Sequence, residues 1–429
     1  MATILTVLFF VLLALTVPLV FSMGLGATVA LLWDGSVPLV IIVQRMFAGS
    51  DSTTLLAIPF YIFAGNLMEE AGISAQLVNL SRALVGHIRG SFGMVTVVAE
   101  YFFSGLSGST AADISAIGSL LIPAMRRIGY RSEHAAAIVA AATSMGSLVP
   151  PSLGMIVMAA TMEISVGALF FAGFLPAAAI ALVLMLLIYF QARRIGLPVE
   201  KRATVGQMAS AFKGSILALL MPVIIFGGIL GGVATATEAG AVACLYGFVI
   251  GAFVFRTLKL RAIVRIAVKS AMLTGIVMLL VSTATVFAWI LATQQVPQRL
   301  GTLVFSLSRE PAVFLVMSSL VFMIVGGLLE GVPAMLILIP IFAPMAQVVG
   351  LNTLHFAIVM YTAINIGLFL PPVGAGFLLS AALAEVGVEK TARSFLPFLI
   401  ALLIGLVIVG AVPPLSLLLP EAMGLAGKR

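Results

Sequence analysis

The chain carries the same pattern of helix-breaking residues twice, and the second copy follows the first at a constant distance. Pro344 lies as far after Pro123 as Gly350 lies after Gly129, and we call this distance the repeat offset. Without a gap between 105 and 397, the repeat offset also relates Gly105 to Gly326, His134 to His355, Gly146 to Gly367, Pro150-Pro151 to Pro371-Pro372 and Phe174-Leu175-Pro176 to Phe395-Leu396-Pro397. Gly and Pro at matching positions of two apolar halves indicate a transporter whose discontinuous helices meet at a central site.

The composition predicts an all-α polytopic membrane protein. Hydrophobic residues make up 62% of the chain and charged residues only 9%, whereas about 25% of a soluble domain is charged. A spanning helix needs about 20 apolar residues, so roughly ten spans and some re-entrant pieces fit. The longest polar stretch, 191–213, is too short to form a soluble domain.

Three further features exclude other classes. The single Cys244 rules out a disulfide framework. No Lys or Arg precedes Arg45, so we interpret residues 1–32 as a retained first span and not as a signal peptide. The sequence pI of 9.9 comes from basic residues in short loops between spans. Such residues are topology signals, and nothing about them favours nucleic acid.

Apolar stretches and their flanks divide the chain into expected segments. Spans are expected near 3–32, 36–50 (which is short enough to be partial), 54–72, 132–162, 165–191, 215–233, 236–255, 272–293, 352–382 and 395–418. The apolar stretches 91–126 and 311–346 are too long for one span, and we expect each to be a re-entrant helical hairpin. Segments 75–90 and 295–310 are amphipathic and are expected to lie as arms along the membrane surface. Segment 256–270 is expected to be a basic connector on the cytoplasmic side.

The distribution of charge predicts that the two halves are inverted copies. With the N-terminus outside, the cytoplasmic face holds all of the 22 Lys and Arg residues except Arg45, Arg299, Arg309, Lys428 and Arg429. The first hairpin then lies on the cytoplasmic side and the second on the outer side. The first repeat is 1–210, with scaffold 1–72, arm 75–90, hairpin 91–126, broken span 132–162 and span 165–191. The second repeat is 211–429, with scaffold 211–294, arm 295–310, hairpin 311–346, broken span 352–382 and span 395–418.

The middle of the first hairpin is rich in small and hydroxylated residues. The run from Ser104 to Asp113 reads SGLSGSTAAD. Small residues let backbones approach closely, and hydroxyls and carbonyls can bind a cation where they face protein or a wet cavity. Asp113 would be expensive facing lipid. We interpret the run as a binding site, although each Ser taken alone could serve helix packing.

Each broken span contains a pair of prolines. A Pro pair removes two amide donors and frees upstream carbonyls, so two half-helices meet with their ends exposed. Half-helix C-termini suit Na⁺ and N-termini suit carboxylates. A simple kink is the alternative at Pro150-Pro151, but Pro371-Pro372 repeats the break in the other half.

Other polar residues are weighed one by one. Glu330, the one acid of the second hairpin, is a candidate contact for a cation or substrate, and alternatively a helix cap or the partner of an Arg. His134 and His355 have no second ligand at metal spacing, so we expect them to be structural. Glu238 follows Thr235 at the spacing of a capping box. Nothing resembles a phosphate loop, a nucleophile with its base or a zinc helix, so the chain is not expected to be an enzyme.

These motifs resemble the large membrane subunit of tripartite ATP-independent periplasmic (TRAP) transporters, within the wider ion-transporter superfamily. The resemblance runs in order along nearly the whole chain, through Leu55-Leu56-Ala57-Ile58-Pro59-Phe60, Ala64-Gly65, Leu106-Ser107-Gly108-Ser109, Ala112-Asp113, Leu121-Ile122-Pro123, Pro150-Pro151-Ser152, Thr237-Glu238-Ala239-Gly240-Ala241, Leu336-Ile337-Leu338, Pro340 and Pro371-Pro372-Val373-Gly374. It implies an elevator-type, Na⁺-driven importer of organic acids in the bacterial cytoplasmic (inner) membrane. It also implies two partners, a small four-helix membrane subunit and a periplasmic substrate-binding protein.

The resemblance also implies site residues. One Na⁺ would lie among Ser104, Ser107, Gly146, Val149 and Pro151, and a second among Gly326, Gly367, Leu370 and Pro372. An organic anion would lie between the two hairpin tips, near Ser109, Thr110, Asp113, Ser152, Glu330, Asn365 and Gly374. The chain departs from the family where Glu330-Gly331-Val332-Pro333 replaces the usual Asp then Thr, and where Leu370 replaces a Thr before the second Pro pair.

Three alternatives stay open from the sequence. A stand-alone carboxylate transporter of the same superfamily would need no partner. A passive channel is disfavoured by inverted repeats with two hairpins. An intramembrane enzyme would need a metal cluster or a nucleophile with a base, which Cys244, His134 and His355 do not supply. Which organic acid is carried is not specified by this chain.

Overall fold

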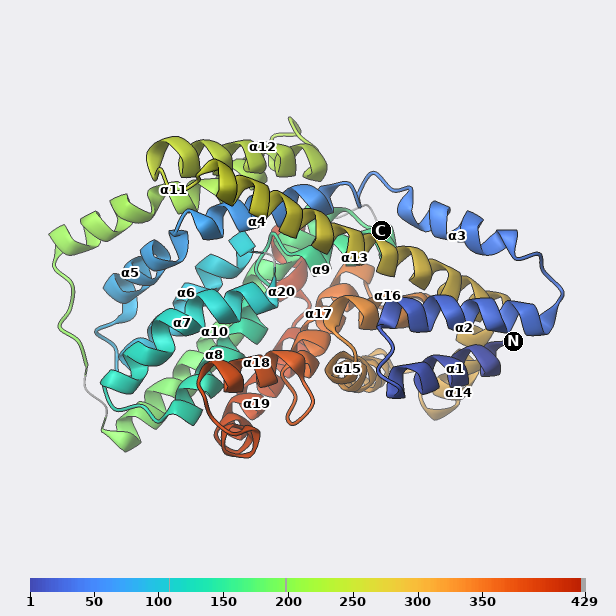
Figure 1. Cartoon of the computed structure of the whole chain (residues 1–429). Coiled ribbons are helices and arrows are strands. Elements are labelled where there is room, and N and C mark those ends of the chain that lie inside the picture. The colour runs from blue at the N-terminus through green and yellow to red at the C-terminus, as the bar shows by residue number, and fades with distance from the viewer. Residues whose placement is uncertain (108, 197–198, 426–429) are drawn as a thin grey trace.

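The computed structural model describes residues 1–107, 109–196 and 199–425, and the regular secondary structure of these residues is helical (Figure 1). The helices are α1 (Ala2–Ala14), α2 (Leu19–Asp34), α3 (Val40–Ser50), α4 (Ala57–Glu70), α5 (Ile73–Val85), α6 (Ser91–Ser107), α7 (Thr110–Arg127), α8 (Ser132–Gly146), α9 (Leu153–Met162), α10 (Val166–Ile195), α11 (Val205–Leu230), α12 (Ala236–Val249) with the π-helical turn η1 (Ile250–Val254), α13 (Leu260–Thr293), α14 (Val296–Leu307), α15 (Pro311–Leu328), α16 (Gly331–Val348), α17 (Thr353–Leu368), α18 (Ala375–Leu383), α19 (Val388–Ala411) and α20 (Pro414–Ala422).

Helix bounds recur along the chain with the shift found in the sequence. Moved by the repeat offset, Thr110–Arg127 (α7) coincides with Gly331–Val348 (α16), and the start of α8 coincides with that of α17. The turn before each broken span contains a glycine with positive φ, Gly129 at +100° and Gly350 at +78°. Because only Gly adopts this conformation without a steric penalty, the same residue stops the helix at the same place in both halves.

Two predicted spans and one predicted connector differ in their bounds from the helices of the structure. Residues 3–32 form two packed helices, α1 and α2, because Pro18 cannot continue a helix from α1 and instead stands at the N-cap of α2. The predicted connector 256–270 is irregular only as far as Lys259, and from Leu260 it is the first part of α13, which continues without a break to Thr293. The predicted span 395–418 ends at Ala411, where Pro413 and Pro414 separate α19 from α20.

Among the described residues, seven helices have the length and apolar composition to cross a membrane. They are α10, α11, α12 with η1, α13, α15, α16 and α19. The expected partial span 36–50 forms α3, which has 11 residues and is shorter than the roughly 20 that a bilayer requires. Since α15 and α16 have 18 residues each, their length alone does not distinguish a pair of spans from a re-entrant hairpin.

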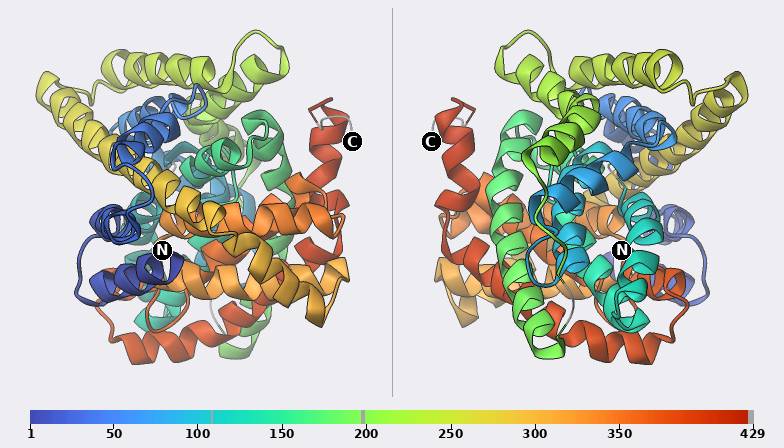
Figure 2. Two further views of the ribbon diagram at one scale, coloured as in Figure 1. Left: turned by 90° about the vertical axis from the view of Figure 1, so that its right-hand side faces the viewer. Right: turned by 90° about the vertical axis from the view of Figure 1, so that its left-hand side faces the viewer.

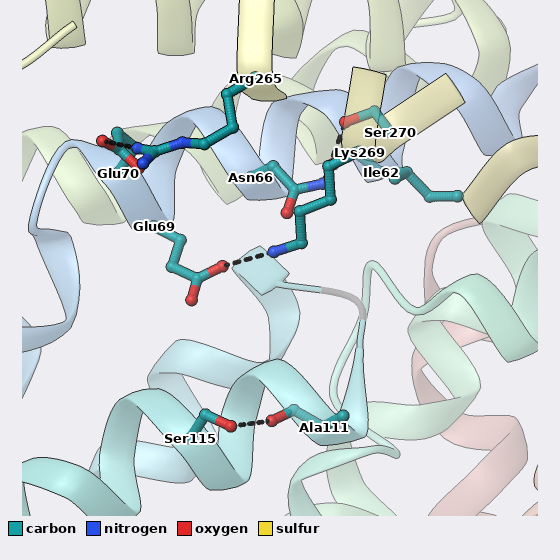
Figure 3. A network of polar contacts seen from close by, with 9 residues as sticks. All are labelled: Ile62, Asn66, Glu69, Glu70, Ala111, Ser115, Arg265, Lys269 and Ser270. Atoms are coloured by element: carbon teal, nitrogen blue, oxygen red, sulfur yellow. Dashed lines mark hydrogen bonds and ion pairs between the residues drawn. The ribbon is translucent and has the colours of Figure 1, made fainter. Parts of the chain in front are cut away.

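The long helix α13 crosses the molecule diagonally, from the end occupied by α11 and α12 to the end occupied by α1, α2 and α14 (Figures 1 and 2). It packs against α2, α3, α4 and α16 on its way. Figure 3 shows its polar contacts with α4, where Arg265 pairs with Glu70 at 2.6 Å and Asn66 Nδ2 donates to Ser270 Oγ at 3.0 Å. The ion pair is partly solvent-exposed, so it contributes little to stability.

The two broken spans form the centre of the molecule. Every residue of α8 from Ala135 to Gly146 is buried, and so is every residue of α17 from Leu354 to Gly367. Ser144 Oγ donates to the Asn365 carbonyl at 3.2 Å, and the repeat offset also separates these two residues. Small residues such as the alanines of α8 let backbones approach closely, which is how helices associate where the surroundings are apolar.

Replacing Gly173 by Ala should destabilise the protein. A Cβ at Gly173, on α10, would lie 2.3 Å from the Leu148 carbonyl oxygen, and backbone cannot move aside as a side chain can. Overpacking of this kind costs about 1–3 kcal/mol. The melting temperature of the detergent-purified protein measures the effect.

The matched control is Gly275→Ala, because nothing lies within 4 Å of a Cβ at this exposed position of α13. Its melting temperature should be unchanged or slightly higher, since Ala favours a helix over Gly by about 1 kcal/mol. Equal melting temperatures for the two variants would contradict the close contact.

Candidate functional site

The helices α6 and α7 are joined by a polar contact close to the turn between them. Ser104 Oγ donates a hydrogen bond of 2.8 Å to Asp113 Oδ2. Both side chains are buried, with 3% and 1% of their surface exposed. Asp113 stands in the first turn of α7, where the helix dipole favours a negative charge. The side chain of Ser107, predicted as a Na⁺ ligand, lies outside the described residues.

Both broken spans open at their proline pairs through matching turns. Helix α8 ends at Gly146 and α17 at Leu368. Val149 N donates to the Gly146 carbonyl at 2.7 Å, and Leu370 N donates to the Gly367 carbonyl at 2.8 Å. Each carbonyl oxygen has a second lone pair. The predicted positions Val149, Pro151, Leu370 and Pro372 therefore lie on two short loops whose backbone oxygens are available to a cation.

In each half, glycines let the turn between the two paired helices approach the proline break of the same half. These turns join α6 to α7 in the first half and α15 to α16 in the second. A Cβ at Gly105 would lie 2.4 Å from the Pro150 carbonyl oxygen, so only Gly fits there. In the second half, a Cβ at Gly327 would lie 3.0 Å from the Gly367 carbonyl oxygen, and one at Gly326 would lie 2.8 Å from the Ile364 carbonyl oxygen. The structure thus brings the described residues of each predicted Na⁺ set to one turn-and-break junction.

A cavity of about 360 Å³ lies between the two junctions. Six of the seven predicted substrate residues line it, namely Ser109, Thr110, Asp113, Ser152, Glu330 and Asn365. The seventh, Gly374, packs instead against the break, where a Cβ would lie 2.4 Å from the Leu368 carbonyl oxygen. Helix α13 closes one side of the cavity with an apolar wall of Leu273, Ile276, Val277 and Leu280.

The first turns of four helices open onto this cavity. They contribute Thr110 and Ala111 of α7, Leu153 and Gly154 of α9, Gly331 and Val332 of α16, and Ala375 and Gly376 of α18. The first turn of a helix has backbone N–H groups without intrahelical partners and the positive end of the dipole. Their convergence makes the cavity suited to a carboxylate.

The charged side chains that line the cavity are acidic. Asp113 and Glu330 contribute carboxylates, and no Lys, Arg or His is among the described lining residues. Glu330 occupies the N-cap position of α16 without a side-chain capping bond, and none of the ion pairs formed by the described residues includes it. An anion in the cavity would therefore need helix ends, hydroxyls or a bound cation for its neutralisation.

Two larger clefts lie elsewhere. One of about 490 Å³ is lined by the α4–α13 polar contacts of Figure 3, and one of about 740 Å³ lies near the loop between α3 and α4. Neither brings the two proline breaks together. The smaller cavity is the candidate site because both junctions and the helix N-termini meet there, which volume alone would not indicate.

Sequence reasoning missed two residues of the site region. Tyr361 lines the cavity, and its hydroxyl lies 2.6 Å from Ser152 Oγ, which links the two broken spans. It precedes Asn365 by four residues, so helical spacing on α17 could have indicated it. Glu100 is fully buried on α6, four residues before Ser104, and an ionisable residue in an apolar stretch is itself a signal of function.

Several polar residues outside the cavity join helices or cap them. His355 Nδ1 lies 2.6 Å from Ser416 Oγ, which ties α17 to α20. Thr235 and Glu238 form the expected capping box at the start of α12.

Comparison with known proteins identifies the family of this chain. The family model described as "Tripartite ATP-independent periplasmic transporter, DctM component" matches residues 6–415. A C4-dicarboxylate TRAP transporter large permease from Pseudomonas aeruginosa is 37% identical over 94% of this chain and 95% of its own length. A sialic acid TRAP transporter large permease from Vibrio cholerae is 36% identical, with the same two coverages.

Among solved structures, the YdaH transporter of Alcanivorax borkumensis has a similar fold. The two share 18% sequence identity and a TM-score of 0.63 over 86% of each chain. An identity this low relates the folds alone. The family match and the two relatives, each covering nearly the whole chain, establish that this multi-pass membrane protein is a transporter permease of the DctM family, the large permease components of TRAP transporters.

Proposed function

We propose that this permease imports small organic acids by Na⁺-coupled secondary active transport across the bacterial cytoplasmic membrane. In this proposal it acts with a small membrane subunit and a periplasmic substrate-binding protein, as the tripartite family name implies. Its relatives are named for C4-dicarboxylates and sialic acid, both of which carry carboxylates. The observation that carries the proposal is a cavity with acidic side chains and helix N-termini between two broken helices.

The charges in the cavity support coupling to a cation. An organic anion entering a space that already holds Asp113 and Glu330 meets like charges in a medium of low dielectric. Na⁺ bound beside these groups would remove the repulsion. The breaks offer backbone carbonyls to Na⁺, while the first turns of α9 and α18 offer N–H groups to the carboxylate. Anion and cation therefore bind better together than apart, which is the basis of coupled transport.

The contacts of α13 support an elevator movement between inverted repeats. The described side-chain hydrogen bonds and ion pairs of α13 either close within the helix or join it to α3 and α4. Toward the cavity it presents only Leu273, Ile276, Val277 and Leu280. An apolar surface without directional bonds lets a neighbouring block slide past it. In our proposal α6–α9 and α15–α18 form the moving block, with both helix pairs as re-entrant hairpins, while α1–α4 and α11–α13 stay fixed.

Neutralising Asp113 should strongly reduce Na⁺-coupled uptake. In Asp113→Asn the side chain keeps its shape and its contact with Ser104 but loses its charge, so the apparent Na⁺ affinity and the uptake rate should each fall at least about tenfold. Uptake of a radiolabelled organic acid into proteoliposomes, driven by an imposed Na⁺ gradient, measures both. The reconstitution contains the permease with its small subunit and the loaded binding protein.

The control for this variant is Glu389→Gln. Glu389 lies on α19 in an exposed pair with Arg393, so its loss should leave uptake unchanged. Na⁺ coupling would be refuted if the uptake rate of the wild type were the same with and without a Na⁺ gradient. The assigned site would be refuted if Asp113→Asn took up substrate at the wild-type rate. Full uptake by the permease alone would show that the chain is a stand-alone carrier.

Removing the Tyr361 hydroxyl should weaken substrate binding. Tyr361→Phe breaks the contact with Ser152 at the cavity wall, and one neutral hydrogen bond contributes about 0.5–1.5 kcal/mol. We expect the apparent KM for the substrate to rise roughly two- to tenfold, with little change in maximal rate. Tyr246→Phe is the matched control, since the Tyr246 hydroxyl donates to the Leu217 carbonyl in the scaffold, away from the cavity. Equal KM values for the two variants would exclude Tyr361 from the site.

A further inference from the structure

Glu100 is a buried acid beside the first break, and it forms no ion pair among the described residues. It lies on α6 with none of its surface exposed. Thr143 Oγ1, on α8, donates to Glu100 Oε1 at 2.7 Å. The second oxygen, Oε2, is buried without a hydrogen-bond partner among the described residues. Burying a polar atom without a hydrogen-bond partner costs folding free energy, so such an atom indicates that a ligand binds there.

The unpartnered oxygen faces the junction of the first turn and the first break. A Cβ built on Gly146 would lie 3.4 Å from Glu100 Oε2 and 3.1 Å from Ser104 Cβ. Ser104 lies one helical turn after Glu100 on α6, and its hydroxyl bonds to Asp113. Glu100 and Ser104 thus line the same side of Gly146, where the sequence resemblance places the first cation.

Two buried carboxyl groups, Glu100 and Asp113, lie at the first junction. The ion pairs among the described residues do not include Glu100. They join Arg82 with Glu200, Arg131 with Glu133, Arg265 with Glu70, Lys269 with Glu69 and Arg393 with Glu389. Buried charges in proteins are paired or bind metal ions. A small hard cation with oxygen ligands satisfies both the charge and the unpartnered oxygen.

The second half of the chain has no acid at the positions equivalent to Glu100 and Asp113. The repeat offset relates Glu100 to Val321, Thr143 to Ile364 and Asp113 to Ala334. The second junction therefore offers a cation backbone oxygens but none of these side-chain oxygens. The repeat preserves the shape of the two junctions while their charge differs.

We propose that Glu100 Oε2 is a direct ligand of the Na⁺ bound at the first break, which makes this the tighter of two unequal cation sites. The inference rests on the proposed Na⁺ coupling and adds to it a ligand in this chain. Thr143 positions the carboxylate by holding Oε1, so that Oε2 faces Gly146. Neutralising Glu100 weakens the first site, while the second site, which has no counterpart of this acid, is left unchanged.

The test measures Na⁺ binding without transport. The full chain is purified in detergent, and binding of radioactive Na⁺ is measured alongside the melting temperature during a NaCl titration, with choline chloride keeping the ionic strength constant. For Glu100→Gln we expect the tighter phase of Na⁺ binding to weaken at least tenfold. In Na⁺-free buffer this variant should melt at a higher temperature than the wild type, because an amide leaves no unbalanced charge buried.

Two further variants keep the test decisive. Glu100→Asp retains the charge on a shorter side chain and should bind Na⁺ with intermediate affinity, and it replaces Glu100→Gln if that variant does not fold. Glu389→Gln removes an exposed acid on α19 and should match the wild type. If the Glu100 variant binds Na⁺ as tightly as the wild type, Glu100 is not a ligand, but the proposed Na⁺ coupling still stands. A wild-type protein that binds no Na⁺ overturns the proposed coupling as well.

Discussion

The structure depends on how backbone groups are satisfied where α8 and α17 are interrupted inside the protein. A proline pair removes two amide donors from each helix and leaves carbonyls without their usual partners. In apolar surroundings such groups persist only where protein or a wet cavity receives them. Short turns at Gly146 and Gly367 satisfy part of the need. The Pro150 carbonyl lies against Gly105 of the first helix pair, and the Gly367 carbonyl lies against Gly327 of the second, so each break packs against a helix pair at the candidate site.

Close approach of backbones is the second condition, and glycine meets it. The turn of α6–α7 reaches the first break because Gly105 has no Cβ to meet the Pro150 carbonyl, and Gly327 has the same role at Gly367. The two junctions then enclose a cavity onto which the first turns of α7, α9, α16 and α18 open. Positive helix ends and acidic side chains in one small space suit an anion that enters together with cations.

The repeat makes the two junctions alike in shape, but the side chains make them different in charge. Ser104, Asp113 and Glu100 lie at the first junction, whereas the positions equivalent to Glu100 and Asp113 in the second half are Val321 and Ala334. Leu370 also removes a side-chain oxygen from the second break, because the TRAP family usually has a Thr at this position. One helix scaffold can therefore hold two cation sites of different strength, and the difference depends on a few polar residues.

Gly and Pro positions by themselves determined much of the architecture. Together with the two long apolar stretches, they predicted the two helix pairs and both broken spans, because these residues act on the backbone locally. The family resemblance, and not these positions, implied that Ser109, Asp113, Ser152 and Asn365 lie together, and all four line one cavity. Local signals were less decisive at 3–32, where one proline divides a predicted span into two helices. They were also less decisive at 256–270, where no helix breaker separates the predicted connector from α13.

Only the tertiary structure decided that Tyr361 reaches Ser152, that Glu100 faces Gly146 and that α13 closes the cavity. These facts depend on which side of each helix meets a neighbour far away in the sequence, and that is set by packing across the whole molecule.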